Sequence, residues 1–358
     1  MKIIGLCLWL LSLSVFATPY TPKSADEIIA HWVAPKDDAL QSIKTRAHLQ
    51  PNDPATLVAL ANAYLDQASQ PGQSRFYGLA QATLKPLIEN NNNDKSLWLV
   101  WAQIQQHQHN FSSAQTALNK VLQQEPSNIN ANLLNARIAV IQEQPLMARN
   151  MCLKLLGNAD LLTVSACSLE ANTYLHPENL TSIYHQLVDM INTQGLPEDE
   201  RAIWIIQLLA DIALRNNDPI EAANWLAKKL DNASVNYLAQ WADVQLALHN
   251  NKNVLDHLSE IVNQAAEMDD ALLLRLALAE KNMAQSTHWQ TRLSERIALR
   301  EQRHDSLHAS ELALYYLDIS PNPQKSLYWA KINIQNTREY NDKKILARAE
   351  KANQTQGI

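Results

Sequence analysis

Two cysteines in the body of the chain are the first residues that suggest a definite chemistry. Cys152 and Cys167 lie in the middle of the sequence, whereas the third cysteine, Cys7, lies in an apolar N-terminal run. If the N-terminal run with Cys7 is cleaved off as a signal peptide, two cysteines remain. An even number of cysteines in an oxidising compartment favours a disulfide. The alternative is two small buried apolar residues, because free cysteine packs well in protein cores. We expect the disulfide.

A second candidate is the histidine pair His304 and His308, whose i, i+4 spacing would place two imidazoles on one helical face. Asp305 and Glu311 lie nearby, but no third imidazole or thiol is placed beside them, so solvated histidines are favoured and no metal site is expected. The chain also lacks G-x-x-x-x-G-K, G-x-G-x-x-G, H-E-x-x-H, G-x-S-x-G and C-x-x-C. The sequence therefore predicts a protein that is not an enzyme and uses no cofactor.

The composition narrows the class of partner. The chain has 358 residues, 46% of them apolar and 18% charged, which is enough to bury a large core. Its 30 basic and 36 acidic side chains give a net charge of -6, which is no electrostatic footprint for nucleic acid. With only 6 glycines, the chain cannot assemble a glycine-rich phosphate loop. We expect no nucleic-acid partner.

The N-terminus has the three-part pattern of a secretory signal peptide. Lys2 precedes an uncharged run that ends at the small residue Ala17, which predicts a signal peptide at residues 1–17. The run is about 14 residues long, shorter than the roughly 20 that a membrane-spanning helix needs. A lead segment, residues 18–38, follows. We expect export to a bacterial periplasm or the outside, with no integral membrane segment after cleavage.

An internal repeat organises the rest of the chain. Its clearest unit carries apolar and small residues at fixed spacing and closes with a proline: Trp98, Trp101, Ala102, Ala114, Leu118, Val121 and Pro126. The same twelve-residue step between small or apolar positions recurs along the chain. It sets the expected onsets of the units at residues 54, 95, 129, 161, 203, 235, 270 and 306. These spacings scatter around a period of about 34 residues, not the roughly 40 to 47 of HEAT and armadillo repeats.

This pattern resembles the tetratricopeptide repeat, W-x2-L-G-x2-Y…A-x3-F…P, over about residues 35 to 350. The resemblance implies an all-α fold, a right-handed α-α superhelix of about eight helical hairpins. We expect this solenoid at residues 39–350 and a polar C-terminal tail at residues 351–358. Three stretches resemble exported bacterial tetratricopeptide proteins: Arg75–Gly78, His109–Ala114 and residues 326–338. Gln105 and Gln245 stand where an aromatic would sit and are expected to weaken their hairpins.

The repeat also places the two cysteines. Cys152 falls on the second helix of one unit and Cys167 on the first helix of the next, and such helices are neighbours in the stack. A bridge between them would close a loop of about 15 residues and stabilise the fold by about 3 kcal/mol in the chain-entropy model.

The first helix of a tetratricopeptide hairpin lines the concave face, so the resemblance implies which side chains point into a groove. One position beyond the small packing residue, the successive units carry Asn62, Gln103, Arg137, Leu169, Asp211, Asp243, Leu278 and Leu314. Polar positions in such a groove can bind a peptide backbone and apolar ones its side chains. A merely solvated face is the alternative. Only Asn62 and Arg137 fit a clamp for a peptide C-terminus, so that ligand is not expected.

One turn is longer than the others. It runs from Gln67 to Tyr77, and Arg75 within it could clamp a carboxylate of a partner. The favoured alternative is that Phe76 and Tyr77 pack over the neighbouring hairpin.

These observations lead to two hypotheses about function. The first is a non-catalytic scaffold of the bacterial envelope that binds a protein or peptide through Asn62, Gln103, Arg137, Asp211, Asp243 and Arg75. The alternative is an envelope accessory that binds a glycan or associates with a transporter through exposed aromatics such as Trp204 and Trp225. Buried tryptophans would remove the glycan hypothesis.

Overall fold

The computed structural model describes Ser24 and residues 37–355, apart from Asn91, Ala266 and Gln285. Within this part of the chain every regular element is helical. In chain order the α-helices are α1 (Asp38–Leu49), α2 (Pro54–Ala68), α3 (Arg75–Glu89), α4 (Lys95–His107), α5 (Phe111–Gln124), α6 (Ile129–Ile141), α7 (Pro145–Leu153), α8 (Leu161–Leu175), α9 (Leu180–Gln194), α10 (Arg201–Arg215), α11 (Pro219–Leu226), α12 (Val235–Ala247), α13 (Asn251–Gln264), α14 (Asp270–Met283), α15 (His288–Gln302), α16 (Ala309–Leu314), α17 (Pro323–Asn336) and α18 (Tyr340–Thr355). A π-helical turn, Tyr315–Ile319, continues α16.

Consecutive helices pack as hairpins, from α2–α3 to α16–α17, with α1 before the first hairpin and α18 after the last. The first helices of the eight hairpins begin at residues 54, 95, 129, 161, 201, 235, 270 and 309. Six of these starts equal the expected onsets, and the other two differ by two or three residues. The expected all-α superhelix of about eight hairpins is confirmed for the described residues.

Local sequence signals explain where these helices begin. Five of the eight first helices, α2, α4, α6, α8 and α12, start after a residue whose side chain accepts a hydrogen bond from the first turn, as in the bonds from Thr56 N to Asp53 (2.9 Å) and from Thr163 N to Asp160 (2.9 Å). Such a cap satisfies an amide that has no partner inside the helix. Several second helices instead begin with proline at the first helical position, where its missing N–H costs nothing.

Four turns inside hairpins share one backbone conformation. Each contains a non-glycine residue with a left-handed φ: His109 (57°), Glu143 (58°), Asn217 (62°) and His249 (60°). The next amide then bonds the carbonyl five residues earlier, as in Asn250 N to Gln245 O at 2.9 Å. This is the Schellman helix end, which usually has glycine at that position. The chain thus forms these turns without glycine, at a cost of about 1 kcal/mol each.

Small residues lie where the hairpin helices contact each other. Ala102, Ala210 and Ala242 are fully buried at the packing positions of first helices, as expected from the repeat. Gln105 and Gln245, which stand in place of an aromatic, are also buried. The Gln245 side-chain oxygen accepts a hydrogen bond from Asn250 Nδ2 at 3.0 Å, and Gln105 is bonded in the same way. These glutamines therefore tie the end of a first helix to the start of the second.

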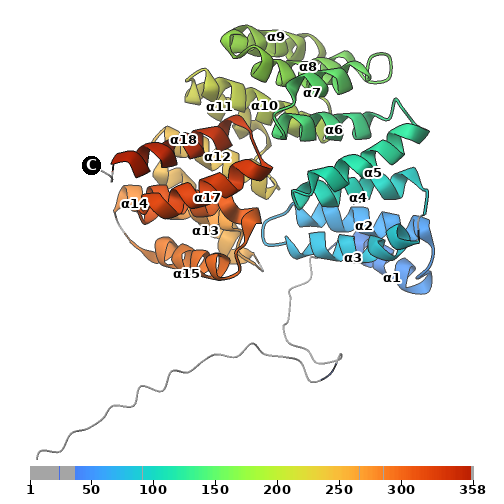
Figure 1. Cartoon of the computed structure of the whole chain (residues 1–358), viewed down its shortest axis with the longest axis horizontal. Helices are drawn as coiled ribbons and strands as arrows, with labels where there is room; N and C mark the ends of the chain where they lie inside the picture. The colour runs from blue at the N-terminus through green and yellow to red at the C-terminus, as the bar shows by residue number, and fades with distance from the viewer. Residues whose placement is uncertain (1–23, 25–36, 91, 266, 285, 356–358) are drawn as a thin grey trace, which may run out of the picture. The chain divides into compact units, whose positions relative to one another are not determined.

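The solenoid of residues 37–355 winds far enough that its early and late hairpins meet. Figure 1 shows α1–α5 on one side, α12–α18 on the other and α6–α11 above them. The turn between α2 and α3 bridges the two sides: Val235 N donates to Ser69 O at 3.0 Å, and Gly72 N donates to Asp269 Oδ2 at 2.7 Å. The inner face of the superhelix is therefore enclosed in part by the chain itself.

The structure describes most of the expected C-terminal tail but almost none of the expected N-terminal segments. The signal peptide expected at residues 1–17 and nearly all of the lead segment expected at 18–38 lie outside the described residues. Helix α18 continues through Thr355, so residues 351–355 of the expected tail are helical. Helix α18 is a single helix after the eighth hairpin, so it adds a final half-unit that the expected count of repeats did not include.

Candidate functional site

The five candidate residues on first helices fall into two groups. Asn62 on α2 and Gln103 on α4 are exposed. Arg137 on α6, Asp211 on α10 and Asp243 on α12 form ion pairs within the chain. Arg137 pairs with Glu170 on α8 and Asp243 pairs with Arg275 on α14, so these pairs join neighbouring first helices, whereas Asp211 pairs with Arg215 on its own helix. The expected role of the three residues in binding a partner stays a prediction.

Arg137 is the centre of one network. Its Nη1 lies 2.9 Å from Glu170 Oε1 on α8, and its Nη2 lies 2.8 Å from Glu339 Oε1 in the turn between α17 and α18. The second oxygen of Glu170 accepts a hydrogen bond from Trp204 Nε1 at 3.1 Å. A guanidinium with two carboxylate partners is held in one orientation, since its fork of donors fits them geometrically.

Arg215 is the centre of a second network on α10. Its Nη1 donates to Thr173 Oγ1 at 3.0 Å and pairs with Asp211 Oδ2 at 3.2 Å, while its Nη2 donates to Thr173 O at 2.7 Å. Its Cζ lies 5.1 Å from the ring centre of Tyr174 and 5.0 Å from that of Tyr340. The guanidinium is therefore in cation–π range of two rings, one of which belongs to the start of α18. We call Arg137, Glu170, Thr173, Tyr174, Asp211 and Arg215 the α6–α10 surface.

Burial shifts the pKa values of the ionisable side chains on this surface. Burial raises the pKa of Glu170, and it also raises the pKa of Asp211 although Arg215 partly opposes the shift. Burial disfavours the charged form of Arg137, but the carboxylates of Glu339 and Glu170 outweigh it and raise the pKa of that guanidinium. The surface thus holds two guanidinium groups in fixed positions beside aromatic rings, each paired with a carboxylate of the chain.

Six residues of these networks escaped the sequence analysis: Glu170, Thr173, Tyr174, Arg215, Glu339 and Tyr340. Glu170 directly follows Leu169, the residue expected on the inner face, so shifting the reading by one position would have found it. Arg215 lies one helical turn after Asp211, and that i, i+4 pairing is a readable signal. Glu339 and Tyr340 had no signal, because they reach this surface from the other end of the chain.

The long turn between α2 and α3 packs within the chain. Phe76 is buried and its ring centre lies 5.4 Å from that of Tyr64, while the Tyr77 ring stacks on His107. The Cζ of Arg75 lies 4.9 Å from the ring centre of Phe76. Tyr77 thus packs over the neighbouring hairpin as expected, whereas Phe76 contacts Tyr64 of its own hairpin, and Arg75 is half-buried against Phe76.

The structure joins Cys152 and Cys167 by a disulfide, with their Cα atoms 5.5 Å apart. Cys152 lies on α7 and Cys167 on α8, the second helix of one hairpin and the first helix of the next. Both are buried. The bridge therefore links two consecutive units of the stack.

The histidine pair does not share a helical face. Helix α15 ends at Gln302, and His304 lies in the following turn with a left-handed φ of 49°. His308 Nδ1 lies 3.2 Å from Asp305 Oδ2. Among the residues that the structure describes, no group of three or more His, Cys, Asp or Glu side chains is arranged to hold a metal ion.

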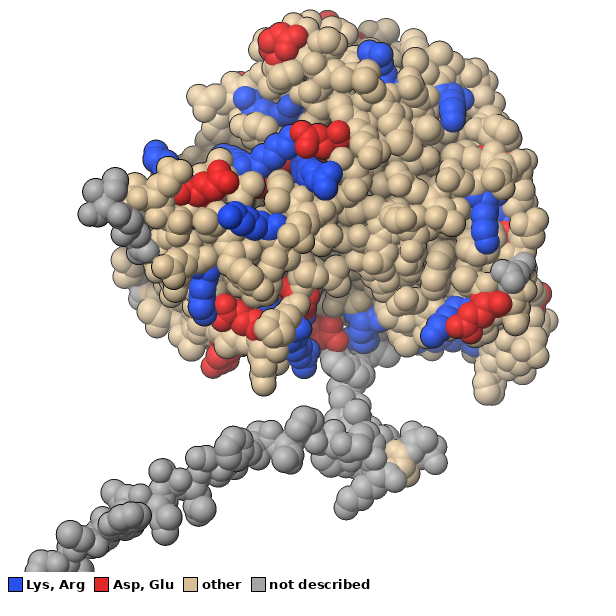
Figure 2. Space-filling model, in the orientation of Figure 1, with Lys and Arg blue, Asp and Glu red and all other residues tan. Residues whose placement is uncertain are grey.

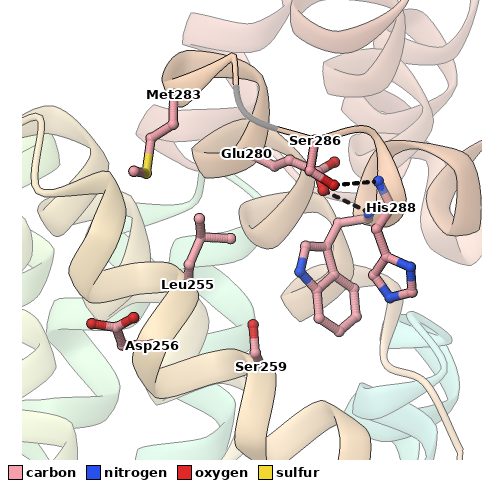
Figure 3. Close-up of a pocket in the computed structure, with 8 residues that line it drawn as sticks. Leu255, Asp256, Ser259, Glu280, Met283, Ser286 and His288 are labelled. Carbon is pink, nitrogen blue, oxygen red and sulfur yellow. Dashed lines mark hydrogen bonds between the residues drawn. The ribbon is translucent and has the colours of Figure 1, made fainter.

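A cavity of about 410 Å³ opens between α13 and the turn from α14 to α15 (Figure 3). Leu255 and Met283 form part of its wall, and Glu280 supplies a carboxylate. Glu280 accepts hydrogen bonds from Trp289 N at 3.1 Å and Gln290 N at 3.0 Å. Burial opposes ionisation of Glu280, but these backbone hydrogen bonds outweigh it and lower the pKa. The carboxylate thus caps α15 and is not poised to donate a proton.

The charged side chains on the face in Figure 2 lie mostly as basic and acidic neighbours, with neither sign covering a broad area. This agrees with the many ion pairs between hairpins, such as Arg275 Nη2 to Asp243 Oδ2 at 2.7 Å. None of the described helices combines the length and the apolar character that crossing a membrane would require.

Consecutive helical hairpins, small residues at the hairpin contacts and a repeat near 34 residues form an all-α solenoid, which is the fold that the tetratricopeptide resemblance implied. No family model and no curated protein matches the chain. Among solved structures, it is similar to a tetratricopeptide repeat protein from Parabacteroides merdae ATCC 43184, with 12% identity, a TM-score of 0.48 and coverage of 67% of this chain and 91% of that chain. It is also similar to the P58(IPK) TPR domain, with 11% identity, a TM-score of 0.27 and coverage of 83% of this chain and 99% of that chain.

Proposed function

We propose that this protein is a non-catalytic scaffold of the bacterial envelope that binds a protein or peptide partner on the inner face of its superhelix. The observation that carries the proposal is the α6–α10 surface, where two arginines are fixed among carboxylates and aromatic rings. Arginine and aromatic side chains dominate the energetics of protein interfaces. Solenoids commonly use their extended concave surface for binding.

The chemistry of the inner face also supports a role without catalysis. Its ionisable groups are engaged with each other, as Asp211 is with Arg215 and Asp243 with Arg275. A catalytic acid or base must reach a substrate proton with a suitable pKa. These carboxylates serve instead to orient guanidinium groups.

An oxidising compartment is part of the proposal. Disulfides persist in secreted and periplasmic proteins and are rare in the cytosol. The Cys152–Cys167 bridge, together with the signal peptide expected at residues 1–17, supports export to the periplasm or beyond.

The glycan alternative loses its structural basis. It required exposed tryptophans, yet Trp225 is only 7% exposed and Trp204 is half-buried with its indole nitrogen bonded to Glu170. None of the tryptophans within the described residues belongs to the exposed class. Association with a transporter remains a special case of the proposed protein binding.

The test compares two double variants of the mature chain as baits for envelope proteins. Asn62→Arg with Gln103→Arg adds two charges to exposed positions on the first helices α2 and α4. The control, Ala82→Arg with Ser113→Arg, adds the same charges to exposed positions on the second helices of the same two hairpins. We expect the wild-type and control baits to enrich one partner that the inner-face variant loses, as measured by mass spectrometry.

Two results would contradict the proposal. A bait that enriches no protein above background removes the scaffold function. A partner retained equally by both variants removes the inner face as its binding site, provided that circular dichroism shows both variants to be folded.

A further inference from the structure

The turn between α17 and α18 lies against the α6–α10 surface. Glu339 Oε1 is 2.8 Å from Arg137 Nη2, and the Tyr340 ring centre is 5.0 Å from Arg215 Cζ. Farther along α6, Arg338 N donates to Ile141 O at 2.8 Å. A carboxylate and an adjacent aromatic ring therefore occupy the two arginines at once.

This contact differs from the packing that forms the last hairpins. Helix α18 packs against α16, α17 and the π-helical turn, with Ala349 fully buried and Ile345 nearly so. Its end beside α6, α8 and α10 makes polar and aromatic contacts instead, from Glu339 of the turn and Tyr340 of α18, together with an ion pair between Lys343 of α18 and Glu143. Tyr340 is still 42% exposed although its ring faces Arg215. The apolar burial that stabilises α18 therefore does not depend on the α6–α10 surface.

Another molecule could take the places of Glu339 and Tyr340 on the two arginines. The pair between Arg137 and Glu339 is partly open to solvent, with the two side chains 40% and 27% exposed. A competing carboxylate would restore the same charge-assisted bond, so the exchange leaves no guanidinium unpaired. A competing ring would likewise restore the cation–π contact with Arg215.

We propose that the α6–α10 surface is a recognition site for a partner segment that carries one carboxylate next to one aromatic ring, and that Glu339 and Tyr340 occupy it in the free protein. The carboxylate pairs with Arg137, and the ring stacks beside Arg215 and Tyr174. Glu170 and Asp211 already balance the two arginines, so a segment with several acidic residues fits less well. This inference rests on the proposed scaffold function and adds the chemistry of the partner.

A tethered segment is a strong competitor for an external ligand. Its effective concentration is on the order of millimolar, so the wild-type protein should bind a free peptide of the same sequence only weakly. Removing the two internal side chains should expose the site. The peptide therefore reports directly on whether the surface is a binding site or only a structural contact.

The experiment uses a fluorescent peptide with the sequence of residues 336–343 and the full mature chain. Fluorescence anisotropy measures its affinity for the wild type, for Glu339→Ala with Tyr340→Ala, and for a control. The control, Tyr328→Ala with Glu350→Ala, removes the same residue types from exposed positions of α17 and α18, the helices on either side of the turn. We expect the first variant to bind at least about tenfold more tightly than the wild type and the control.

Two further arms identify the contacts. Adding Arg137→Ala to the opened variant should abolish the gain in affinity, and so should a peptide with Glu339→Gln or Tyr340→Ala. The pair Glu339→Gln with Tyr340→Leu preserves side-chain size and serves if the alanine variant is unfolded by circular dichroism. Failure of both pairs to fold would overturn the inference, because it would show that the segment is an essential part of the core.

Absence of saturable binding to a folded opened variant would also overturn it, as would affinity that does not depend on Arg137. These outcomes are separate from failure of the scaffold function. If the peptide experiment fails in one of these ways while the wild-type bait still retains a partner that the Asn62 and Gln103 variant loses, the scaffold function stands and only this recognition site is removed.

Discussion

The disulfide between Cys152 and Cys167 allows the most direct quantitative test of the fold. The bridge spans 15 residues of sequence and joins α7 to α8. In the chain-entropy model, closing a loop of that length stabilises the folded state by about 3 kcal/mol. Replacing both cysteines by alanine also removes two buried sulfur atoms, which adds on the order of 1 kcal/mol. Reduction of the wild type should therefore cost less than the double substitution.

Native-state hydrogen exchange is the appropriate assay, because long repeat arrays do not always unfold in a single two-state transition. It reports the free energy of opening for each helix separately. We expect amide protection in α7 and α8 to fall about a hundredfold when the wild type is reduced, since that factor corresponds to about 3 kcal/mol. Protection in α13, which lies on a distant hairpin, should change little.

The double variant supplies the control, since reductant must leave its protection unchanged. Thiol titration of the denatured, unreduced wild type should find no free thiol in the mature chain. The reasoning is refuted if that titration finds two free thiols. It is also refuted if reduction changes protection in α7 and α8 by less than about fivefold, because the bridge would then contribute under about 1 kcal/mol.

Three further predictions concern charge, backbone and packing. Burial raises the pKa of Asp269 to about 6, so the free energy of unfolding should fall as pH rises from about 4 to 6. Asp269→Asn should remove this pH dependence and raise the free energy of unfolding at pH 8 by on the order of 2 kcal/mol. Equal stability of the two proteins in urea denaturation at pH 8 would contradict this prediction. His249 and Gly157 both have a positive φ, which glycine adopts without strain. His249→Gly should therefore stabilise the protein by about 1 kcal/mol, and Gly157→Ala should destabilise it by a similar amount. Shifts of the melting temperature in the opposite directions would refute this. Ala210→Trp should overpack a fully buried helix contact and lower the free energy of unfolding by about 1 to 3 kcal/mol. Ile203→Trp, at an exposed position of the same helix, should leave that free energy nearly unchanged. Equal melting temperatures for the two variants would show that the repeat register is wrong.

The hairpins could be read from the sequence because their signals are local. Ala102 and Ala210 recur at a fixed step in the repeat, and polar residues such as Asp53 and Asp160 precede the first helices. Each hairpin contacts mainly its neighbours, so the pattern within one or two units suffices to place its helices. The turns were harder to predict, because Glu143 takes a left-handed conformation that is uncommon for a non-glycine residue of its type.

The candidate site could be read only in part. Arg137, Asp211 and Asp243 lie on the first helices as the resemblance implied, but their ion-pair partners depend on how neighbouring helices are rotated. A shift of one residue along a helix turns a side chain by about 100°, so Leu169 and Glu170 point in different directions. A periodic pattern alone does not decide which of two adjacent residues meets Arg137.

The sequence by itself determined the class of fold, the length of the repeat and the helices that carry the inner face, because period, small residues and helix caps act over short distances. Only the tertiary structure decided that Glu339 and Tyr340 lie on Arg137 and Arg215, and that the turn beside Gly72 meets Asp269. Both contacts depend on how far the solenoid winds. That winding is the sum of small rotations between successive hairpins, and no single unit of the sequence encodes the sum.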